Sequence, residues 1–270
     1  MNILLVGSLG KMANKVKEIA DENDTKIIAE IDKNFVCEIK ENFTSKSERN
    51  FVHRRDKNQS KKSSKFFDQN KSNCDVKYHK NCYTNFKKIP KKLIAKIDVV
   101  LDFSNPTILK EELDFCVHNN LPVAICSTGH NQDNIDTINR SSKIIPICLS
   151  ANTSFGINLI SKILKTNINN FQNFDVNIID THHKDKKDIP SGTAKEFAKI
   201  LSTLSPTTLA IRTGKIVGNH DIILTSNFEQ IAISHKAFDR KIFAKGALNI
   251  CHFLNKKMPP KLYTMQDIFD

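Results

Sequence analysis

The stretch NILLVGSLGKMA, residues 2–13, decides the fold that the sequence predicts. Its first part, 2–6, is short and mostly apolar, as in a buried strand, and a helical pattern continues beyond residue 11. Gly7 permits a tight turn between the two elements, and Gly10 permits a pyrophosphate to approach the helix N-terminus. A strand, a glycine turn and a helix in this order predict the start of a dinucleotide-binding domain.

The end of the next predicted strand, 26–31, supports this interpretation. Asp32 follows the glycine turn at about the separation at which an acidic residue binds the ribose hydroxyls of a dinucleotide. Lys33 comes directly after it, and its ammonium group can pair with a 2′-phosphate. The two side chains together predict a nicotinamide cofactor, either NADPH or NADH.

Strands and helices continue to alternate up to about residue 150. Strands are expected over 97–103, 122–127 and 144–150, and helices over 104–116 and 135–142. This alternation predicts an α/β fold with a Rossmann-type, doubly wound parallel sheet. Ligands of such sheets bind beyond the carboxyl ends of the strands. The residues expected at those ends are Gly7, Ser104, Ser127, Thr128, Ala151 and Asn152.

The second half of the chain has a different order of elements. Three strand-like runs follow one another there with no helix between them, which predicts a smaller α+β domain with an open, antiparallel or mixed sheet. The runs are 209–217, 222–226 and 229–235. Before them we expect a helix over 157–164, a strand over 174–179 and a helix over 194–204, and after them a helix over 239–254.

The stretch DTHHKDKKDIPSGTA, residues 180–194, concentrates the polar chemistry of the chain. It lies where a strand gives way to a helix, and a helix start binds anions through its free N–H groups. His182 can transfer protons near neutral pH, and Lys186 can hold a carboxylate or donate a proton. Hydroxyl groups and a close backbone approach come from Ser191, Gly192 and Thr193. A charged loop with an ordinary helix cap has the same composition.

The net charge of +12 comes from a single segment. Residues 33–97 hold 18 of the basic and 6 of the acidic side chains, so the rest of the chain is balanced. Ser, Lys and Asn dominate from 44 to 73, a composition that buries little apolar surface. We therefore expect residues 34–92 to form a long solvated or disordered insert.

Two further functions are conceivable for this insert, and both are disfavoured. Cys74, His79 and Cys82, with Cys37, could bind zinc, but no pair has the C-x2-C spacing of common zinc sites, so no metal is predicted. Aromatic side chains interleaved with lysines could contact nucleic acid, but a solvated insertion explains them more simply. The aromatic residues are Phe51, Phe66, Phe67, Tyr78, Tyr83 and Phe86.

The remaining composition favours a soluble, cytoplasmic protein. No apolar run is long enough for a membrane span, and Met1 leads directly into a short strand, unlike a signal peptide. The seven cysteines are scattered and odd in number, which fits reduced thiols better than a disulfide framework.

The motifs taken together resemble those of the 4-hydroxy-tetrahydrodipicolinate reductase (dihydrodipicolinate reductase) family. The resemblance covers nearly everything except residues 34–92. GSLGKMA resembles the family's GxxGRMG, LDFSNP its DFT/S-x-P strand end, and STG at 127–129 its GTTG. ANTSFGIN at 151–158 and HHKDKKDIPSGTA at 182–194 resemble its A-N-F-S-x-G-x-N and HH-x-x-K-x-D-x-PSGTA motifs. IVGNHDI and ISHKAFDRKIFAKGAL resemble its later VGEH and THKA-x-x-R-x-x-F-A-x-GA segments.

This resemblance implies NAD(P)H-dependent reduction of 4-hydroxy-tetrahydrodipicolinate, a small dicarboxylate, in lysine and diaminopimelate biosynthesis. It implies a dinucleotide-binding domain over 1–153 and 239–270, a substrate-binding and oligomerisation domain over 154–238, and a homotetramer. His182 stands at the family's general acid position and Lys186 at its second catalytic position, while His183, Ser191, Gly192 and Thr193 are expected to bind substrate. The cofactor-binding residues expected are Gly7, Ser8, Leu9, Gly10, Lys11, Met12, Asp32, Lys33, Cys126, Ser127, Thr128, Ser150, Ala151, Asn152 and Thr153.

Some positions depart from the family pattern. Ala13 replaces a glycine, Cys126 replaces the first glycine of GTTG, and Thr153 replaces an aromatic residue or methionine. Asp180 stands where glutamate is common. Two other functions remain open: a related dehydrogenase of a small amino or imino acid, and a decayed reductase that binds polyanions through its basic insert.

Overall fold

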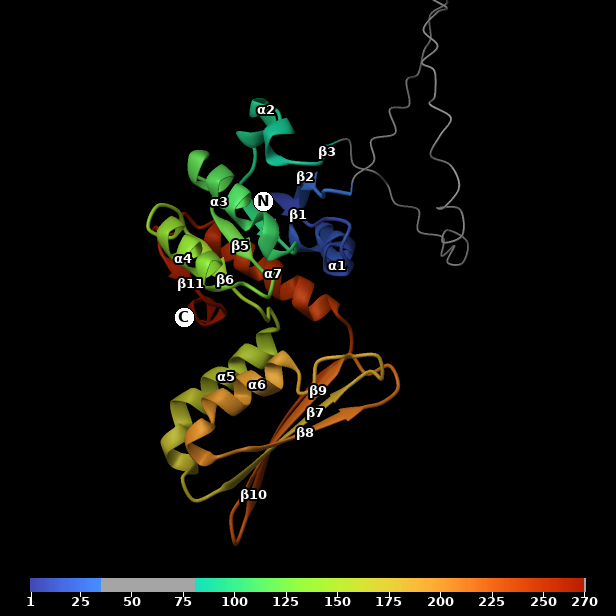
Figure 1. Cartoon of the computed structure of the whole chain (residues 1–270), viewed down its shortest axis with the longest axis vertical. Coiled ribbons are helices and arrows are strands. Elements are labelled where there is room, and N and C mark those ends of the chain that lie inside the picture. Colours follow the sequence, from blue (N-terminus) through green and yellow to red (C-terminus); the bar gives the residue numbers. More distant parts are fainter. Residues whose placement is uncertain (35–80, 270) are drawn as a thin grey trace, which may run out of the picture. The chain divides into compact units, whose positions relative to one another are not determined.

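The computed structural model describes residues 1–34 and 81–269. A seven-stranded sheet contains both ends of the described chain, and all of its strands run parallel (Figure 1). Its order, β11-β6-β5-β4-β1-β2-β3, is that of a doubly wound dinucleotide-binding sheet with one added edge strand. The predicted Rossmann-type fold is therefore confirmed. The strands are β1 Asn2–Val6, β2 Lys26–Ile31, β3 Cys82–Tyr83, β4 Val99–Asp102, β5 Val123–Ile125, β6 Ile147–Leu149 and β11 Leu262–Tyr263.

Helices cover both faces of this sheet. Alternation along β1 sends Ile3 and Leu5 into one core and Leu4 and Val6 into the other, as a strand buried on both faces requires. The first core packs against α1 (Lys11–Ile19) and α7 (Lys241–Leu254). The second packs against α2 Lys91–Ile94, α3 Leu109–His118 and α4 Gln132–Ser141. Short 3-10 helices occupy Asp21–Asn23, Phe86–Lys88, Pro106–Ile108 and Met265–Ile268.

Residues 81–92 belong to the folded domain, so the expectation that the insert extends to residue 92 was wrong. The backbone N–H of Glu30 donates to Asn81 O and that of Asp32 donates to Tyr83 O, which adds β3 to the edge of β2. Phe86 is only 4% exposed and packs in the second core, so its aromatic ring serves the fold. Its strand escaped prediction because two residues are too few for a periodic pattern. The predictions for 35–80, including the zinc candidates Cys37, Cys74 and His79, lie outside the described residues.

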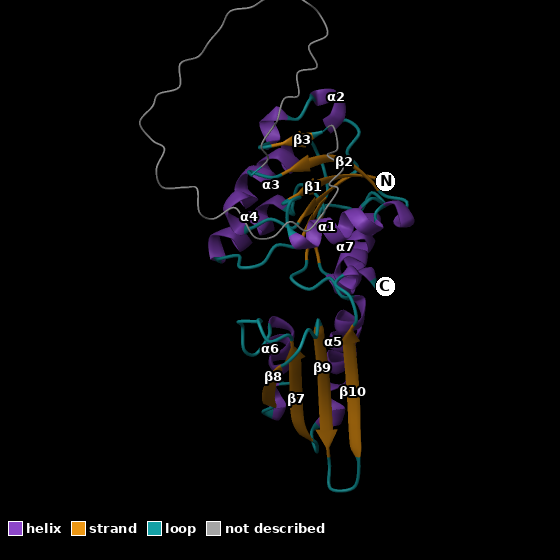
Figure 2. Cartoon of the chain, turned by 90° about the vertical axis from the view of Figure 1, so that its right-hand side faces the viewer, coloured by secondary structure: helices purple, strands orange, loops and turns teal. Residues whose placement is uncertain are grey.

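A second sheet of four strands has the order β10-β9-β7-β8. β7 and β8 are parallel while β9 pairs antiparallel with both β7 and β10, so the predicted mixed sheet is confirmed (Figure 2). α6 connects β7 to β8, because parallel strands require a crossover connection. β8 ends at Arg212, five residues earlier than the sequence predicted, and Gly214 adopts a positive φ in the turn that follows. The elements are β7 Asp175–His182, β8 Thr207–Arg212, β9 Gly218–Thr225, β10 Gln230–Ala237, α5 Phe155–Asn167, α6 Gly192–Ile200, and 3-10 helices Ile168–Phe171 and Ser202–Leu204.

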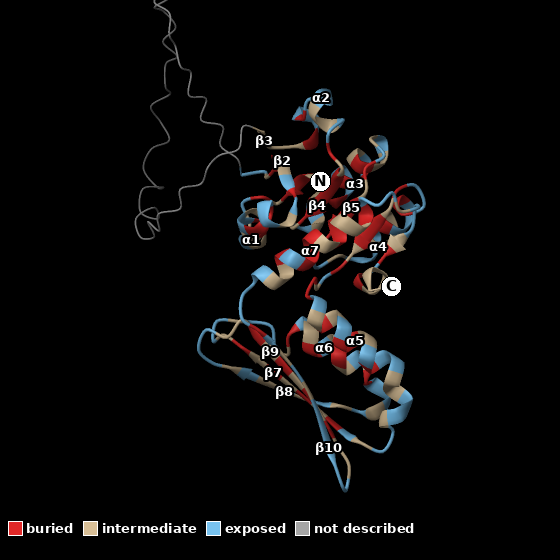
Figure 3. Ribbon diagram, turned by 180° about the vertical axis from the view of Figure 1, so that it is seen from behind, coloured by how far each residue is buried: buried red, intermediate tan, exposed pale blue. Residues whose placement is uncertain are grey.

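One face of this second sheet carries the core that the domain shares with α5 and α6 (Figure 3). Alternate residues of β7 and β9 are buried, and at one end they are apolar, with Val176 and Ile178 on β7 and Ile222 and Leu224 on β9. At the other end the same buried face becomes polar. This change places the candidate site at the carboxyl end of β7.

None of the helices among the described residues is both long and apolar enough to cross a membrane.

Candidate active site

The turn between β1 and α1 is shaped by a glycine that no other residue could replace without strain. Gly7 has a φ of 74°, and a Cβ there would lie 2.7 Å from Ser104 Cα and 2.8 Å from the carbonyl of Phe103. The N–H of Gly10 donates to Gly7 O at 3.0 Å and closes the turn. The turn therefore lies against the carboxyl end of β4, as a dinucleotide site requires.

The start of α1 lacks a side-chain cap. Gly10 occupies the N-cap position without a side-chain hydrogen bond, so the first-turn N–H groups, including those of Lys11 and Met12, are available to an anion. Asp32 lies beside the same turn, where its carboxylate accepts from the N–H of Leu9 at 3.1 Å and from that of Asn34 at 3.0 Å. The predicted glycine-turn residues and Asp32 thus come together, and among them the side chain of Ser8 is buried.

A cavity of about 310 Å³ lies along this turn, and Asp32 and Lys33 line its wall. Thr84, Asn85 and Phe86 line it too, although the sequence analysis assigned these residues to the insert. They reach the cavity because β3 adds to the sheet beside β2. The Oδ1 atom of Asn85 is buried without a hydrogen-bond partner among the described residues, so it is an acceptor free for a donor.

The adjacent ends of β4 and β5 share a buried polar group. Asp102 accepts from the N–H of Ser104 at 2.6 Å and from the Ser127 hydroxyl, and burial raises the pKa of Asp102. Ser127 also lies 3.2 Å from Nε2 of His130. Cys126 is buried, which raises the pKa of its thiol well above the usual value, while Thr128 is exposed. Of the three residues predicted here, Thr128 is therefore the one with an accessible side chain.

The segment after β6 is held by hydrogen bonds. The Ser150 hydroxyl donates to Asn152 O at 2.9 Å, and the Asn152 side-chain amide donates to Thr193 Oγ1 at 3.0 Å. Thr153 is 3% exposed, and its hydroxyl donates to Phe243 O of α7 at 2.6 Å. Asn152 therefore joins the predicted cofactor residues to the predicted substrate residues, while Thr153 anchors the segment and Ala151 is exposed.

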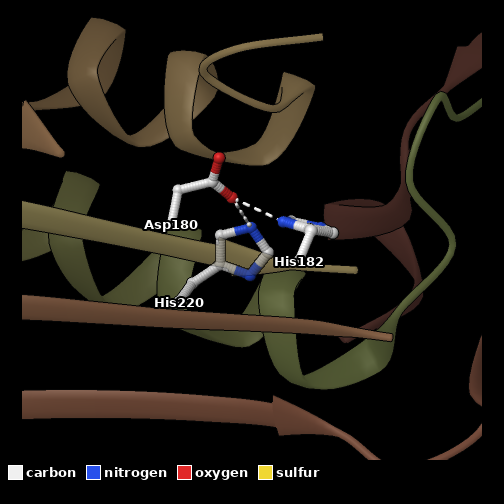
Figure 4. A group of neighbouring side chains, drawn as sticks. All are labelled: Asp180, His182 and His220. Atoms are coloured by element: carbon white, nitrogen blue, oxygen red, sulfur yellow. Dashed lines mark ion pairs between the residues drawn. The ribbon is translucent and has the colours of Figure 1, made fainter. Parts of the chain in front are cut away.

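The polar end of the second sheet brings Asp180 and His182 of β7 together with His220 of β9 (Figure 4). Asp180 and His182 share one face because they are two residues apart on a strand, and His220 is the cross-strand partner of Asp180. All three side chains are buried. Oδ1 of Asp180 lies 2.8 Å from Nδ1 of His182 and 3.3 Å from Nε2 of His220.

The other oxygen of Asp180 is fixed by two donors. Its Oδ2 accepts from Arg212 Nη2 at 3.0 Å and from the N–H of Ser191 at 2.9 Å. Burial alone would raise the pKa of Asp180, but these hydrogen bonds outweigh it and leave that pKa below its ordinary value. Burial lowers the pKa of His182, and the Asp180 carboxylate offsets this only in part. Burial also lowers the pKa of His220, to about 4.

The turn after β7 presents the remaining candidates. The N–H of His183 donates to Ile216 O at 2.8 Å, and the N–H of Lys186 donates to His183 O at 3.1 Å, which closes the turn. Lys186 Nζ lies 2.8 Å from a carboxylate oxygen of Asp188. The charge of Lys186 acts on His182, where it opposes protonation. His182 and Lys186, the two predicted catalytic residues, therefore lie close enough for the charge of Lys186 to lower the pKa of His182.

The start of α6 is capped from within the chain. The Ser191 hydroxyl accepts from the N–H of Ala194 at 3.3 Å and lies 3.2 Å from Nε2 of His220. Ser191 is 2% exposed, whereas Gly192 is exposed and Thr193 is half-buried. The first-turn N–H groups of Gly192 and Thr193 therefore form the accessible part of this helix start.

The three side chains of Figure 4 have the composition of a metal site, and their ligand atoms lie within 4.8 Å of one another. Ligands held about 2.0–2.1 Å from a tetrahedral zinc ion are about 3.3 Å apart. The 2.8 Å separation of Asp180 Oδ1 and His182 Nδ1 is shorter than that, and Arg212 already pairs with the same carboxylate. The geometry favours an ion-paired polar cluster over metal coordination.

Sequence reasoning missed Arg212, His220 and Gly218 as parts of this site. The alternation in GNHDIILT on β9 was the available signal, because it places Gly218 and His220 on the buried face with Ile222. Their proximity to His182 depends on strand pairing over long sequence separations. A single sequence does not specify this register.

Comparisons with known proteins point to one enzyme family. The family model described as dihydrodipicolinate reductase, N-terminus, matches residues 1–153, and the one described as dihydrodipicolinate reductase, C-terminus, matches residues 156–269. A 4-hydroxy-tetrahydrodipicolinate reductase of Clostridium novyi (strain NT) is 40% identical over 192 residues, which are 63% of this chain and 76% of that protein. The protein of the same name from Buchnera aphidicola subsp. Cinara cedri (strain Cc) is 36% identical over 233 residues, 73% of this chain and 84% of that protein.

A solved structure shares the fold. It is a dipicolinate-bound dihydrodipicolinate reductase from Paenisporosarcina sp. TG-14, with a TM-score of 0.73, 18% sequence identity, and coverage of 98% of this chain and 97% of that one. The two family matches together account for nearly the whole chain. The chain belongs to the dihydrodipicolinate reductase family and is an oxidoreductase.

Proposed function

We propose that this protein reduces 4-hydroxy-tetrahydrodipicolinate to tetrahydrodipicolinate with NADPH or NADH, as a step in lysine and diaminopimelate biosynthesis. The observation that carries the proposal is the buried His182–Asp180 pair at the carboxyl end of β7, beside the accessible start of α6, in a chain of this reductase family. The solved relative named as dipicolinate-bound supports a planar dicarboxylate as the kind of ligand.

The dinucleotide is assigned to the glycine turn and its cavity. The uncapped start of α1 suits the pyrophosphate, and Asp32 suits the ribose hydroxyls of the adenosine half. Lys33 is exposed at the same cavity and suits a 2′-phosphate. The acceptor Oδ1 of Asn85 suits the exocyclic amine of adenine. The remaining predicted residues at the ends of β5 and β6 are assigned to the nicotinamide half.

The substrate carboxylates are assigned to α6 and the turn before it. The N–H groups of Gly192 and Thr193 and the hydroxyl of Thr193 can bind one carboxylate, with favourable charge from the helix dipole. His183 and Lys186 supply further donors from the turn. Ser191 supports this arrangement as the cap of the helix.

The protonation step is assigned to His182. When bound, the reduced nicotinamide supplies the hydride. Hydride addition to a conjugated imine-type ring develops negative charge, which a proton must neutralise, and a histidine is suited to donate it near neutral pH. An arriving dicarboxylate also favours the protonated form of His182, because opposite charges stabilise each other at short range. Lys186 then holds the anionic substrate beside the acid.

The proposed function divides the chain into a dinucleotide-binding and a substrate-binding domain. We assign residues 1–153 and 239–270 to dinucleotide binding, because α7 packs in the core of the first sheet, and 154–238 to substrate binding. The face of the second sheet opposite its core leaves Leu209 and Ile211 of β8 exposed, at 52% and 47%. Such a face suits assembly, so we assign it to the interface of a homotetramer. Light scattering on the purified protein tests this, and a monomer would exclude it.

An oxidation assay tests the activity. Substrate is generated in situ by the preceding synthase, and the loss of absorbance of NADPH and of NADH is followed with and without the protein. The expected result is synthase-dependent oxidation of at least one cofactor. Oxidation only with other small imino acids would favour the alternative dehydrogenase. No oxidation, with salt-dependent binding of nucleic acid, would favour the polyanion-binding alternative.

A further inference from the structure

The imidazole of His182 is contacted on opposite sides by groups from two strands. Asp180, on the same strand, places its Oδ1 atom 2.8 Å from Nδ1. This contact is an ion pair and does not meet the geometry of a hydrogen bond. Gly218, the first residue of β9, lies on the other side, because a Cβ built there would be only 2.9 Å from Nε2 of His182. The two ring nitrogens therefore face different surroundings.

Asp180 is held so that it cannot turn away from the ring. Arg212 of β8 donates to its Oδ2 and also to the backbone oxygen of Asp180 at 3.2 Å and that of Asp188 at 2.7 Å. The N–H of Ser191 donates to the same Oδ2. A strand neighbour and a helix start thus fix the orientation of one carboxylate.

His220 completes this support from β9. Its Nε2 lies 3.3 Å from Asp180 Oδ1 and 3.2 Å from Ser191 Oγ, and Phe197 of α6 packs against its ring at a centroid distance of 6.1 Å. Because burial keeps this imidazole neutral at neutral pH, its single proton can serve one of these oxygens without adding charge. His220 therefore stabilises Asp180 and Ser191 without competing with His182 as an acid.

Gly218 keeps the other side of the ring open. A Cβ at a separation of 2.9 Å is closer than side chains normally approach, so any larger residue would push the imidazole or fill the space beside Nε2. A proton donor needs that space, since the acceptor must come within hydrogen-bond distance of the donating atom. Glycine is thus required here for the room that it leaves.

We propose that Asp180 and Gly218 are positioning residues of the reductase: Asp180 fixes the His182 ring through Nδ1, and Gly218 keeps Nε2 clear as the atom that donates the proton. The inference rests on the proposed function for the identity of the acid. It adds that the acid is oriented from β7 and β9 together, with Arg212 and His220 holding the carboxylate in place.

The charges that face His182 set the sign of the expected effect. Asp180 favours its protonated form, whereas Lys186 and Arg212 oppose it, and His220 is neutral above about pH 4. Removal of the Asp180 charge therefore lowers the pKa of His182. Because an acid catalyst must be protonated, the decline of kcat on the alkaline side of the pH profile should begin at a lower pH in such a variant.

The kinetic test compares Asp180→Asn with Asp175→Asn, which changes an exposed residue at the far end of the same strand. For Asp180→Asn we expect kcat to fall by at least about tenfold, and the alkaline limb of its pH profile to shift to lower pH. The Kd of the dinucleotide should be unchanged. Asp175→Asn should retain the wild-type profile. An unaltered pH profile in Asp180→Asn would overturn the proposal, even if kcat were lower.

A second measurement does not depend on turnover. Nitrogen NMR of histidine-labelled wild-type protein, assigned with His182→Gln, identifies which ring nitrogen of neutral His182 carries the proton. The proposal requires the Nδ1–H form, and the Nε2–H form would overturn it. If the protein lacks reductase activity but His182 is the Nδ1–H form, the positioning contact stands and the proposed function fails.

Gly218→Ala tests the open side, with Asn219→Ala as the control because the next side chain on β9 lies on the opposite face. Gly218→Ala should lower kcat at least about tenfold and leave dinucleotide Kd at the wild-type value. Wild-type kcat in this variant would overturn the role of Gly218. If Gly218→Ala does not fold, Asp180→Asn and the histidine NMR of the wild type, which need no change at Gly218, decide the placement of His182; an unaltered pH profile or the Nε2–H form would count against the proposal.

Discussion

α1 and α6 both begin at the carboxyl end of a strand, and their first turns are built in opposite ways. α1 starts at Gly10 with no side-chain cap, after a turn in which Gly7 packs against the backbone of β4. α6 starts at Ser191, whose hydroxyl caps the helix and whose N–H is bound by a buried carboxylate, Asp180. One start consists of exposed backbone, and the other is connected to a network of polar side chains.

Under the proposed function, this difference matches two kinds of anion. A pyrophosphate carries its own charge and needs close approach of the backbone, so glycine and free N–H groups suffice. A reacting dicarboxylate also needs a proton donor at a fixed place, so the second helix start shares its hydrogen bonds with the residues that hold His182. Under the proposed function, catalytic orientation is therefore tied to the fold at α6 and not at α1.

The largest effect is expected from a change at the substrate end, and it should leave the cofactor end unaffected. His182→Gln should lower kcat by roughly a hundredfold to ten-thousandfold, the range that a general acid contributes. Dinucleotide affinity, measured by the fluorescence of bound NADPH, should remain at the wild-type value. Near wild-type kcat would show that another group donates the proton.

The pH dependence of stability should also distinguish the two helix starts, because His220 lies beside the start of α6. The folded-state pKa of His220 is about 4, below the ordinary 6.5, because the charged form is disfavoured by burial. As pH falls from 6.5 to 4 the unfolded chain binds the proton first, so stability is lost over this window, by about 3 kcal/mol from this group.

Thermal melts of wild type and His220→Gln between pH 7.5 and pH 4 measure this contribution. The variant should be less stable at pH 7.5 and should lose less stability on acidification. Parallel pH curves for the two proteins would remove His220 as the source.

Gly7→Ala and Gly192→Ala compare the two helix starts directly. A side chain at Gly7 must adopt a positive φ and meets the backbone of Phe103 and Ser104, whereas one at Gly192 meets nothing within 4 Å. We expect Gly7→Ala to lower the free energy of unfolding by about 2 kcal/mol and Gly192→Ala to change it by less than about 1 kcal/mol, as measured with urea. Equal losses would refute the distinction.

A smaller effect is expected at the cofactor cavity. Lys33→Ala should weaken NADPH binding about fivefold, because one exposed charge pair contributes up to about 1 kcal/mol. NADH binding should be unchanged, since NADH has no 2′-phosphate. Loss of both cofactors to the same extent would argue against this role for Lys33.

The smallest effect is expected from the basic segment. Replacement of residues 44–73, which lie outside the described residues, by a short Gly/Ser linker should leave melting temperature and kcat close to wild type, because loop-closure entropy depends weakly on length. Affinity for polyanions such as heparin should fall with the lost positive charge. The linker must spare Asn81, Tyr83 and Phe86, which belong to the fold. Loss of activity in the folded, shortened protein would assign the segment a catalytic or structural role.

The alternation of strands and helices made the parallel sheet predictable, and the glycine turn placed the cofactor end. Strand boundaries were less certain. LAIRTGKIV has apolar or β-branched residues at both ends, up to residue 217, yet β8 stops at Arg212 because Gly214 turns the chain. β3 escaped prediction because two residues in an edge strand have no measurable periodicity.

The sequence by itself determined most of the elements, the glycine turn and the chemical identity of His182, Lys186 and the start of α6, because these depend on neighbours a few residues away. Only the tertiary structure decided that Arg212, Gly218 and His220 surround His182, and that Thr84 and Asn85 line the cavity beside Asp32. The physical reason is strand pairing. The register that aligns Asp180 with His220 follows from the burial of apolar residues at the other end of β7 and β9, and no local pattern near His182 records it.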